Sequence, residues 1–199
     1  MPVPSLETTL ADSPHWYVLR TTYGQEKKAY DYLSARQVEV FLPTEKVCRV
    51  IHDKRKLVER SLLPNILFAH GTEEQLKTFV YDNVNLPFLR FYYRYLHTDG
   101  CLQKEPLIVP DAQMSTFRII CEARSADAIV ARRAIPRFQR GELARVVAGK
   151  FRGVVGRVVR YKAQQRVGIV IDGLLTVATA YIPDAFLERV TENAGTDNR

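Results

Sequence analysis

The first two thirds of the chain alternates between strand-like and helix-like patterns of apolar residues. Residues Trp16–Thr22 are aromatic and β-branched, which favours a strand that ends at Tyr23-Gly24. Residues Gln25–Arg36 place apolar positions at helical spacing, with an acid in the first turn and a cation in the last. A second strand is predicted over Glu39–Leu42, up to Pro43. This part of the chain therefore opens a mixed α and β domain.

Two runs of alternating polar and apolar residues come next. They span Lys46–Ile51 and Leu57–Leu62, on either side of the charged tip His52–Lys56. Two alternating runs around a short polar segment are typical of a β-hairpin. We therefore predict a hairpin with a charged tip.

The following elements complete the predicted sheet. Ile66–Ala69 is wholly apolar, as in a strand that is covered on both faces. Thr72 and Gln75 form a capping-box pattern that begins a helix. Phe88–Leu96 is aromatic at nearly every step and predicts another strand, and Pro110-Asp111 begins a third helix. The elements predict an α+β sandwich, an antiparallel sheet flanked by helices.

The last third of the chain combines glycines, valines and cations. Glycines between paired valines over Arg137–Tyr161 predict a small, twisted β-barrel of the SH3-like type. Its first strands would be Leu143–Val147 and Val154–Tyr161, joined by the loop Gly149–Gly153. The strand pattern continues through Ile171, a turn at Asp172-Gly173, and short strands over Leu175–Ala178 and Ala180–Ile182.

The two halves are separated by a segment with few large apolar residues. Ser125–Pro136 ends at a proline and has the composition of a linker. We therefore predict two domains. The boundaries are a leader over 1–14, an N-terminal domain over 15–124, a linker over 125–137, a barrel domain over 138–190 and a tail over 191–199.

Composition narrows the class of protein. None of the 199 residues lies in an apolar run near the roughly 20 residues that a membrane span needs. The leader lacks the basic and apolar regions of a secretory signal. Cys48, Cys101 and Cys121 are far apart and odd in number, which suits free thiols in a reducing cytoplasm. We expect a cytoplasmic protein without a membrane partner.

The charge is concentrated in the last third. The net charge is +7 and the isoelectric point about 9.4. Between Arg132 and Arg166 a cation recurs every few positions, and the acid in that window is Glu142. Clustering of this kind is typical of a surface that meets phosphate.

Several motifs, taken in order, resemble the NusG family of transcription factors. In the predicted N-terminal domain they are Trp16-Tyr17, Gly24–Lys28, Phe41–Pro43, Leu63-Pro64, Ile66–Phe68 and Ile108–Asp111. Residues 138–190 resemble the family's KOW domain. The aromatic strand and Ala178–Pro183 are most similar to the specialised UpxY- and RfaH-type paralogs. The resemblance implies a transcription elongation or antitermination factor that serves long operons for capsular and other polysaccharides.

The resemblance also implies a contact with RNA polymerase. Family members bind the β′ clamp helices through an apolar patch, and apolar anchors carry most of the energy of such interfaces. The matching positions here are Ile66, Phe68, Phe88, Phe91 and Ile108. The alternative is that these residues form the core. For Phe88 and Phe91, alternation along a strand predicts that one points inward and one outward.

Specialised members of the family contact the non-template DNA strand through the first helix. Gln25, Lys28, Tyr32 and Arg36 fall on one side of that helix at spacings of three or four. The cations would hold phosphates and Tyr32 would stack on a base. A solvated helix face is the alternative. Further candidates for non-template DNA or nascent RNA at the hairpin tip are Lys54, Arg55 and Lys56.

The barrel has its own implied partners. In the family a loop of the KOW domain binds a small-subunit ribosomal protein or Rho, and here that loop holds Gly149, Lys150, Phe151, Arg152, Gly153, Val154 and Gly156. Val154 departs from the family, because NusG has a second exposed aromatic there. The many valines predict strands at rest, and not the α-hairpin in which RfaH stores this domain.

The sequence carries no motif of a known catalytic site. It has no Walker loop, no G-x-S-x-G and no H-E-x-x-H, and its histidines are dispersed. We expect a monomer that is not an enzyme, with no cofactor and no metal. The alternative function is an RNA-binding or ribosome-associated KOW module. A third class, a small enzyme of RNA metabolism, would need catalytic residues that the sequence does not bring together.

Overall fold

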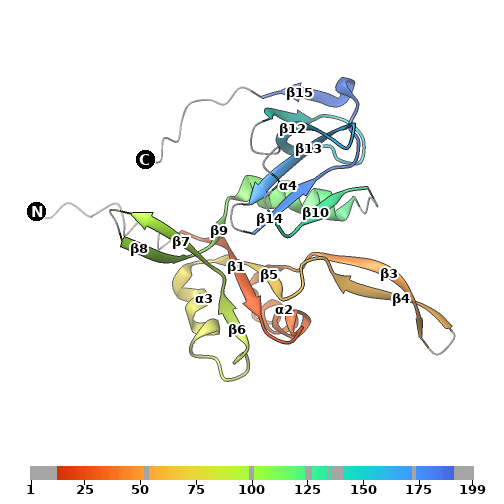
Figure 1. Cartoon of the computed structure of the whole chain (residues 1–199). Coiled ribbons are helices and arrows are strands. Elements are labelled where there is room, and N and C mark those ends of the chain that lie inside the picture. Colours follow the sequence, from red (N-terminus) through yellow and green to blue (C-terminus); the bar gives the residue numbers. More distant parts are fainter. Residues whose placement is uncertain are drawn as a thin grey trace, which may run out of the picture. The chain divides into compact units, whose positions relative to one another are not determined.

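The computed structural model describes residues 13–51, 54–98, 101–123, 127–133, 135, 141–171 and 174–190. The chain divides into two compact units, Met1–Asp111 and Ala112–Arg199 (Figure 1). The predicted tail, nearly all of the leader, and the predicted turns at His52-Asp53 and Asp172-Gly173 lie outside the described residues.

A 5-stranded antiparallel sheet forms the centre of the N-terminal unit. Its strands are β1 (His15–Thr21), β2 (Glu39–Phe41), β5 (Ile66–Gly71), β6 (Leu89–Phe91) and β9 (Ile108–Val109). The order is β2-β5-β1-β6, with β9 also paired to β1. The helices in the described part of this unit are α2 (Glu26–Ser34) and α3 (Glu73–Val80). The predicted cap of α3 is confirmed, because the Thr72 hydroxyl accepts a 3.2 Å hydrogen bond from the backbone N–H of Gln75.

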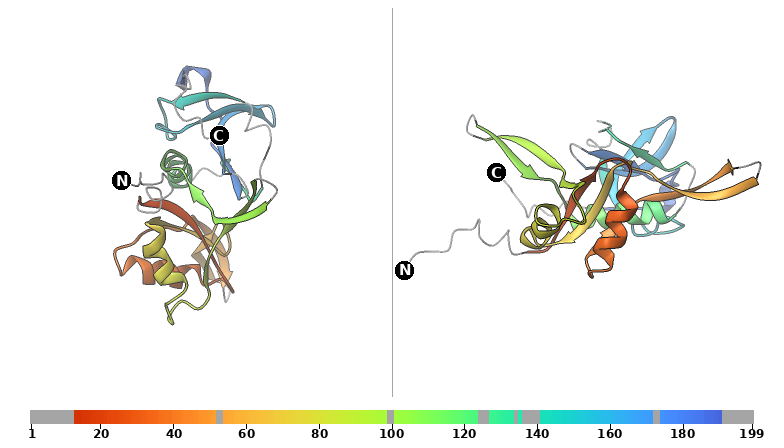
Figure 2. Two further views of the ribbon diagram at one scale, coloured as in Figure 1. Left: turned by 90° about the vertical axis from the view of Figure 1, so that its left-hand side faces the viewer. Right: turned by 90° about the horizontal axis from the view of Figure 1, so that it is seen from below.

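Side chains alternate between the two faces of this sheet. One face, the helix face, packs with α2 and α3 in a single core cluster (Figure 2). Its residues include Tyr17, Leu19, Leu67, Ala69 and Phe91. The opposite face, the second face, carries Trp16, Val18, Phe41, Ile66, Phe68 and Val109. The sheet is apolar on both faces, as the run Ile66–Ala69 predicted, and all four residues of that run are buried.

Two hairpins extend from the central sheet away from each other (Figure 2). The first joins β3 (Thr44–Ile51) to β4 (Lys54–Ser61), as the alternating pattern predicted. The second joins β7 (Tyr93–Thr98) to β8 (Cys101–Pro106), and β8 was not predicted. The prediction of one strand over Phe88–Leu96 is wrong. The chain leaves the central sheet at Tyr92, whose N–H donates to Val18 and whose carbonyl accepts from Leu107, so β6 and β7 belong to different sheets.

A turn before β5 ties two distant segments together. Asn65 takes a left-handed backbone conformation with φ of 66°, which asparagine tolerates better than most residues. Its side-chain oxygen accepts from the N–H of Gly24 at 3.0 Å, and its own N–H donates to the buried carboxylate of Glu26. The first turn of α2 is thereby fixed to the start of β5.

The C-terminal unit is a 6-stranded antiparallel sheet with one long helix. Its order is β10-β14-β13-β12-β11-β15. The elements are α4 (Asp111–Glu122), β10 (Ile129–Ala131), β11 (Glu142–Val146), β12 (Val155–Tyr161), β13 (Gln164–Ile171), β14 (Leu175–Ala178), the 3-10 helix η2 (Asp184–Phe186) and β15 (Leu187–Arg189). The region is built from strands, as the valines predicted. The strand expected over Ala180–Ile182 is absent, and irregular backbone leads there into η2.

Residues of the predicted linker pair with the C-terminal sheet or are hydrogen-bonded to it. Strand β10 lies within the predicted linker and pairs with β14. The Thr176 hydroxyl donates to the carbonyl of Arg133 and accepts from the N–H of Ile135, both at 2.8 Å. In α4, the buried Thr116 hydroxyl exchanges hydrogen bonds of 3.0 and 3.1 Å with the backbone of Val155 in β12. These bonds join α4 and β10 to the strands that follow them.

Two glycines permit close approach of strands in this sheet. A Cβ on Gly156 would lie 2.5 Å from the carbonyl oxygen of Gly168, and one on Gly141 would lie 2.1 Å from that of Val158. Both distances are shorter than real Cβ atoms show, so a side chain at either site would force the strands apart.

The three cysteines form no disulfide bond with one another. Cys48, Cys101 and Cys121 are free thiols. Burial raises the pKa of Cys121 to about 12, with a smaller contribution from Glu122. Among the described residues no helix is long and apolar enough to span a membrane.

Candidate protein and nucleic-acid interfaces

Ile66 and Phe68, the first of the predicted polymerase contacts, lie on the second face of the N-terminal sheet. They are 1% and 0% exposed. Phe68 lies opposite Val18 in the β1–β5 register, and its ring is 6.2 Å from that of Phe41 in β2. Phe41 is only half-buried. The accessible apolar margin of this face is therefore on β2.

Phe88 and Phe91 lie in the core of the helix face. Their exposures are 8% and 3%, and both belong to the cluster that α2 and α3 close. The ring of Phe91 is 5.8 Å from that of Tyr17 in an edge-on arrangement. The expectation that one of the two points outward is wrong, because Phe88 precedes β6 and is not subject to strand alternation.

Ile108 has a different environment from the other four. It is 37% exposed and lies opposite Tyr17 in the β1–β9 register, which puts it at the edge of the helix face. The structure thus brings Ile66 and Phe68 together and separates them from Phe88, Phe91 and Ile108.

Two arginines flank the second face, and sequence reasoning missed both. Arg20 and Arg90 lie opposite each other on β1 and β6, and Arg20 also lies opposite Ile66 on β5. Both side chains are exposed. Because paired residues share a face, the apolar second face ends in a positively charged corner.

Two of the four predicted DNA-binding residues of the first helix, Tyr32 and Arg36, are in direct contact. The Arg36 guanidinium stacks on the Tyr32 ring, with its central carbon 3.4 Å from the ring centroid. The ammonium group of Lys28 lies 5.3 Å from the ring centroid of Phe88. Gln25 precedes the helix and makes no side-chain capping bond. The structure therefore brings Lys28, Tyr32 and Arg36 onto one surface.

Tyr32 has structural contacts that the sequence did not reveal. Its hydroxyl is hydrogen-bonded to the Asn83 side chain and accepts from the Asn85 amide at 3.2 Å. Because Arg36 covers one side of the Tyr32 ring, the guanidinium plane is the surface on which a base would stack.

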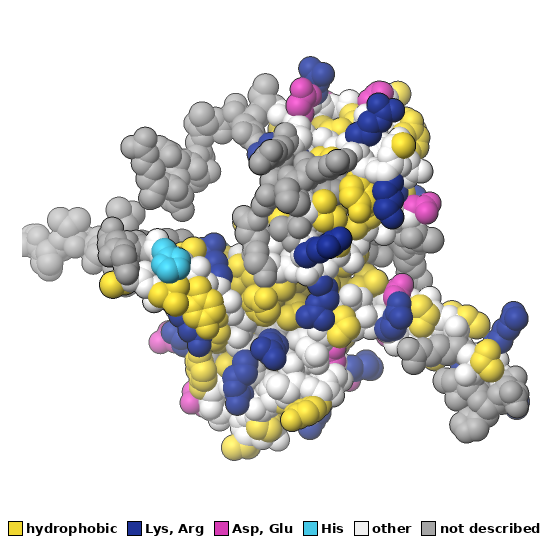
Figure 3. Space-filling model, in the orientation of Figure 1, with side chains coloured by type: hydrophobic (Ala, Val, Ile, Leu, Met, Phe, Trp, Pro, Cys, Tyr) yellow, Lys and Arg dark blue, Asp and Glu magenta, His cyan; other side chains and the backbone are white. Residues whose placement is uncertain are grey.

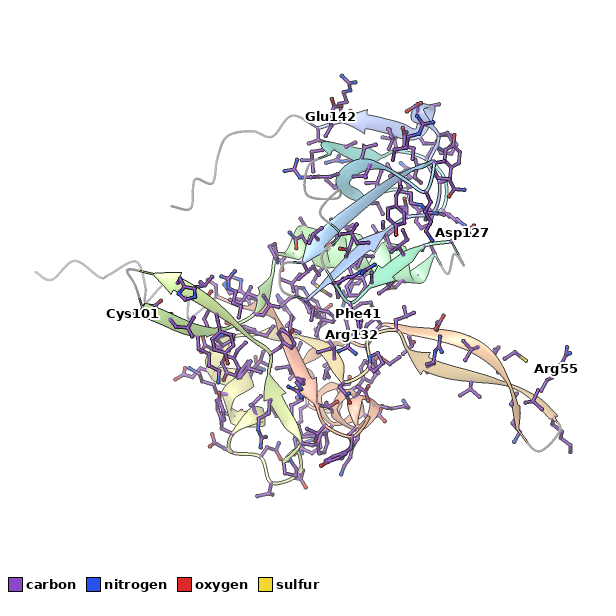
Figure 4. All side chains as sticks on the ribbon, viewed as in Figure 1. Phe41, Arg55, Cys101, Asp127, Arg132 and Glu142 are labelled. Carbon is purple, nitrogen blue, oxygen red and sulfur yellow. The ribbon has the colours of Figure 1, made fainter. Side chains whose placement is uncertain are left out.

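The three predicted cations near the tip of the β3–β4 hairpin divide between its two faces. Lys54 and Lys56 lie opposite Ile51 and Arg49, while Arg55 lies opposite Val50 on the other face. All three cations are exposed. Figure 4 places Arg55 at the end of the hairpin far from Phe41. These side chains form a charged arm and not a single cluster.

The loop expected to bind a ribosomal protein or Rho keeps its large apolar side chains inside. Phe151 and Val154 are 2% and 0% exposed. Gly149 and Gly153 take positive φ values of 78° and 94° and allow the tight turn. Gly156 was predicted to belong to the loop but lies in β12. The side chains that the loop presents are Lys150 and Arg152, both exposed.

The basic run of the last third is only partly a surface feature. Arg166 is 6% exposed and donates to the carbonyls of Asp127 and Thr179. The half-buried Arg157 donates to the carbonyl of Gly141 at 2.9 Å. Arg137 and Arg140 lie outside the described residues. Among the described residues of this unit, the exposed cations are Arg132, Arg133, Arg145, Lys150, Arg152, Arg160, Lys162 and Arg189.

The described residues give little evidence of a catalytic site. They contain no group of three His, Cys, Asp or Glu side chains that could hold a metal ion. Burial raises the pKa of Tyr17 to about 12, with a smaller effect of Glu73, which keeps this core phenol neutral. The accessible features are apolar, aromatic and cationic surfaces, which are suited to binding.

Comparisons with known proteins identify the family. The family model described as "Transcription termination factor nusG" matches residues 14–118, more than half of the chain. A solved structure described as "Domain interaction in Thermotoga maritima NusG" is similar, with 15% identity, a TM-score of 0.41, and coverage of 91% of this chain and 99% of that one. No curated protein matches the sequence. On the family model, this chain belongs to the NusG family of transcription elongation and antitermination factors.

Proposed function

We propose that the protein binds RNA polymerase and promotes processive transcription. The observation that carries the proposal is the family match over residues 14–118, which includes all five strands of the N-terminal sheet. NusG-family proteins bind RNA polymerase and are not enzymes. The protein would act in the cytoplasm as a monomer, on the β′ clamp helices of the polymerase.

We assign the polymerase contact to the second face of the N-terminal sheet. Ile66 and Phe68 lie there, and the half-buried Phe41 gives a partner access to the same face. The exposed Arg20 and Arg90 at its corner would orient an acidic partner helix. Phe88 and Phe91 are left out of this contact, because they are needed in the core of the opposite face.

A binding assay with matched variants tests this assignment. Phe41→Asp places a charge on the accessible part of the second face and should weaken binding to a reconstituted elongation complex at least about tenfold, since a charge without a partner in an apolar contact costs about 1.4 kcal/mol or more. Val84→Asp is the control, because Val84 is 88% exposed in the α3–β6 connection. Circular dichroism checks that both variants are folded. Equal binding of the two folded variants would remove the second face as the contact.

The surface formed by Lys28, Tyr32 and Arg36 would hold the non-template DNA strand during elongation. Lys28 and Arg36 would bind phosphates, and the Arg36–Tyr32 stack would carry a base. In the same complex Lys54, Arg55 and Lys56 would reach further along nucleic acid from the β3–β4 arm. Replacing Arg36 by Gln should reduce read-through of a terminator without changing the affinity for core polymerase.

The targets would be long polysaccharide operons, as in the specialised paralogs that the sequence resembles. Deleting the gene should then shorten transcripts of such an operon toward its distal end and leave short operons unchanged. Uniform transcript levels along the operon would favour a general elongation role.

A second candidate function, binding to RNA or the ribosome, rests on the exposed cations of the C-terminal unit. Lys150 and Arg152 occupy the loop where family members bind a small-subunit ribosomal protein or Rho. Binding to RNA through such cations should weaken steeply with salt, whereas the apolar polymerase contact should change little. Salt titrations with each partner distinguish the two functions.

A further inference from the structure

The β7–β8 hairpin presents a row of rings that neither the family nor the proposed function explains. In the hairpin register Tyr93, Tyr95 and His97 lie opposite Pro106, Lys104 and Leu102. Opposed residues of an antiparallel pair share a face, and residues two apart along a strand do as well. These side chains therefore form one surface, the aromatic ribbon, defined by Tyr93, Tyr95, His97, Leu102 and Lys104.

The ribbon is accessible. Tyr95 is 61% exposed and Leu102 is 59% exposed, and His97 and Lys104 are exposed as well. Figure 3 shows hydrophobic side chains gathered over this hairpin, and Figure 4 places Cys101 at its far end. Exposed side chains that adjoin one another in a contiguous, largely apolar patch indicate a binding site, whereas single exposed rings such as Tyr23 do not.

The ribbon is anchored at its base. The hydroxyls of Tyr93 and Tyr81 are hydrogen-bonded to each other. The Phe91 ring lies 6.2 Å from Tyr93 and 6.1 Å from Tyr81, and Phe91 belongs to the core of the helix face. The first ring of the row is thus fixed to the central sheet, which lowers the entropy that a ligand would lose on binding.

The charges of the hairpin differ between its two faces. On the ribbon face, Lys104 places its ammonium group 4.0 Å from the ring centroid of Tyr93, and the described side chains of that face include no acid. On the opposite face Arg94 and Glu105 form an ion pair. The ribbon face therefore has a cation among its rings. It is complementary to a negatively charged ligand that also has planar aromatic groups.

We propose that the aromatic ribbon binds single-stranded nucleic acid. Rings two residues apart on a strand are separated by about 7 Å. That spacing is about twice the 3.4 Å rise of a strand in a duplex, so successive rings fit the bases of an extended, unstacked single strand. Tyr95 and His97 stack on neighbouring bases, and Lys104, whose ammonium group lies over the Tyr93 ring, holds a phosphate on the Tyr93 side of Tyr95. The phenol of tyrosine and the imidazole nitrogens of histidine can also form hydrogen bonds with the bases. A purely apolar protein partner would leave these polar groups without hydrogen bonds.

Titration of the full chain with labelled oligonucleotides tests the proposal. The probes are fluorescein-labelled dT12 and rU12 and a duplex of the same length, followed by fluorescence anisotropy without polymerase. Tyr95→Ala and His97→Ala should each weaken binding of single strands at least about 5-fold, since stacking on one base contributes that much or more. The matched controls are Leu96→Ala and Gln103→Ala, which lie opposite each other on the other face of the hairpin and should change the affinity less than about 2-fold.

Crosslinking locates the site independently of affinity. A 5-iodouracil oligonucleotide should crosslink to the peptide that contains Tyr95, and Tyr95→Phe should keep both crosslink and affinity. Preference for dT12 or rU12 distinguishes a DNA strand from a transcript. Equal affinities of Tyr95→Ala and Leu96→Ala, crosslinks confined to α2 or the C-terminal unit, or self-association that Tyr95→Ala abolishes would each overturn the proposal. Because polymerase is absent, none of these results bears on the polymerase contact.

Discussion

Strands β4 and β5 follow each other in the chain and have opposite environments. In β4 (Lys54–Ser61) most side chains are exposed, whereas in β5 (Ile66–Gly71) every residue except His70 is buried. β4 is half of a free hairpin, and β5 lies between β1 and β2 in the central sheet. The same local conformation therefore leaves one strand exposed to solvent and buries the other. Mutations should distinguish these two environments.

The largest effect is expected at Phe68 in β5. Phe68→Ala should lower the free energy of unfolding by about 3–5 kcal/mol, because a fully buried ring is replaced by a cavity. Denaturant titration followed by circular dichroism measures the change. The matched change in β4 is Leu57→Ala, which should stay within about 0.5 kcal/mol since Leu57 is 68% exposed. Similar losses at the two positions would mean that β4 is buried in solution and would break the contrast.

A smaller loss is expected at the turn that begins β5. Glu26→Ala removes the buried carboxylate that accepts the Asn65 N–H and should cost about 1–3 kcal/mol, because the half-buried N–H would lose its partner. The control is Glu59→Ala in β4, where the exposed carboxylate accepts from the Thr44 hydroxyl. Unfolding by denaturant would again be measured, and equal effects of the two changes would show that the turn does not stabilise β5.

Local patterns predicted much of this contrast. The wholly apolar run Ile66–Ala69 predicted a strand covered on both faces, and the alternation around His52–Lys56 predicted the hairpin. Both predictions depend only on period and polarity, which neighbouring residues determine. The Thr72 cap was predictable for the same reason, since its partner Gln75 is three residues away.

Features that depend on distant residues could not be predicted in this way. Asn65 joins segments about 40 residues apart, and a sequence pattern gives no register between them. The aromatic run Phe88–Leu96 was read as one strand, because its exit at Tyr92 depends on bonds to Val18 and Leu107.

The same limit applies to the candidate interfaces. Resemblance selected Ile66, Phe68, Phe88 and Phe91 together, but the structure divides them between the two faces of the sheet. Which face of the sheet a side chain occupies depends on how its strand pairs with the neighbouring strands. The aromatic ribbon was missed because Tyr93 and Tyr95 were assigned to one strand with Phe88, and only the register with Leu102 and Lys104 gives its rings one exposed surface.

The smallest effect is expected at the base of β4, where Arg60 pairs with Glu45 of β3. The Arg60 Nε lies 3.0 Å from a Glu45 carboxylate oxygen, and both side chains are more than a third exposed, at 56% and 37%. Water screens such a pair and the side chains lose entropy in making it, so Arg60→Met should cost only about 0.2–1 kcal/mol. A double-mutant cycle with Glu45→Gln measures the coupling, which should disappear in about 1 M salt, where charges are screened within about 3 Å. A coupling energy that persists in high salt would mean that this part of β4 is shielded from solvent, as β5 is. The contrast in exposure between the two strands would then not hold at the base of β4.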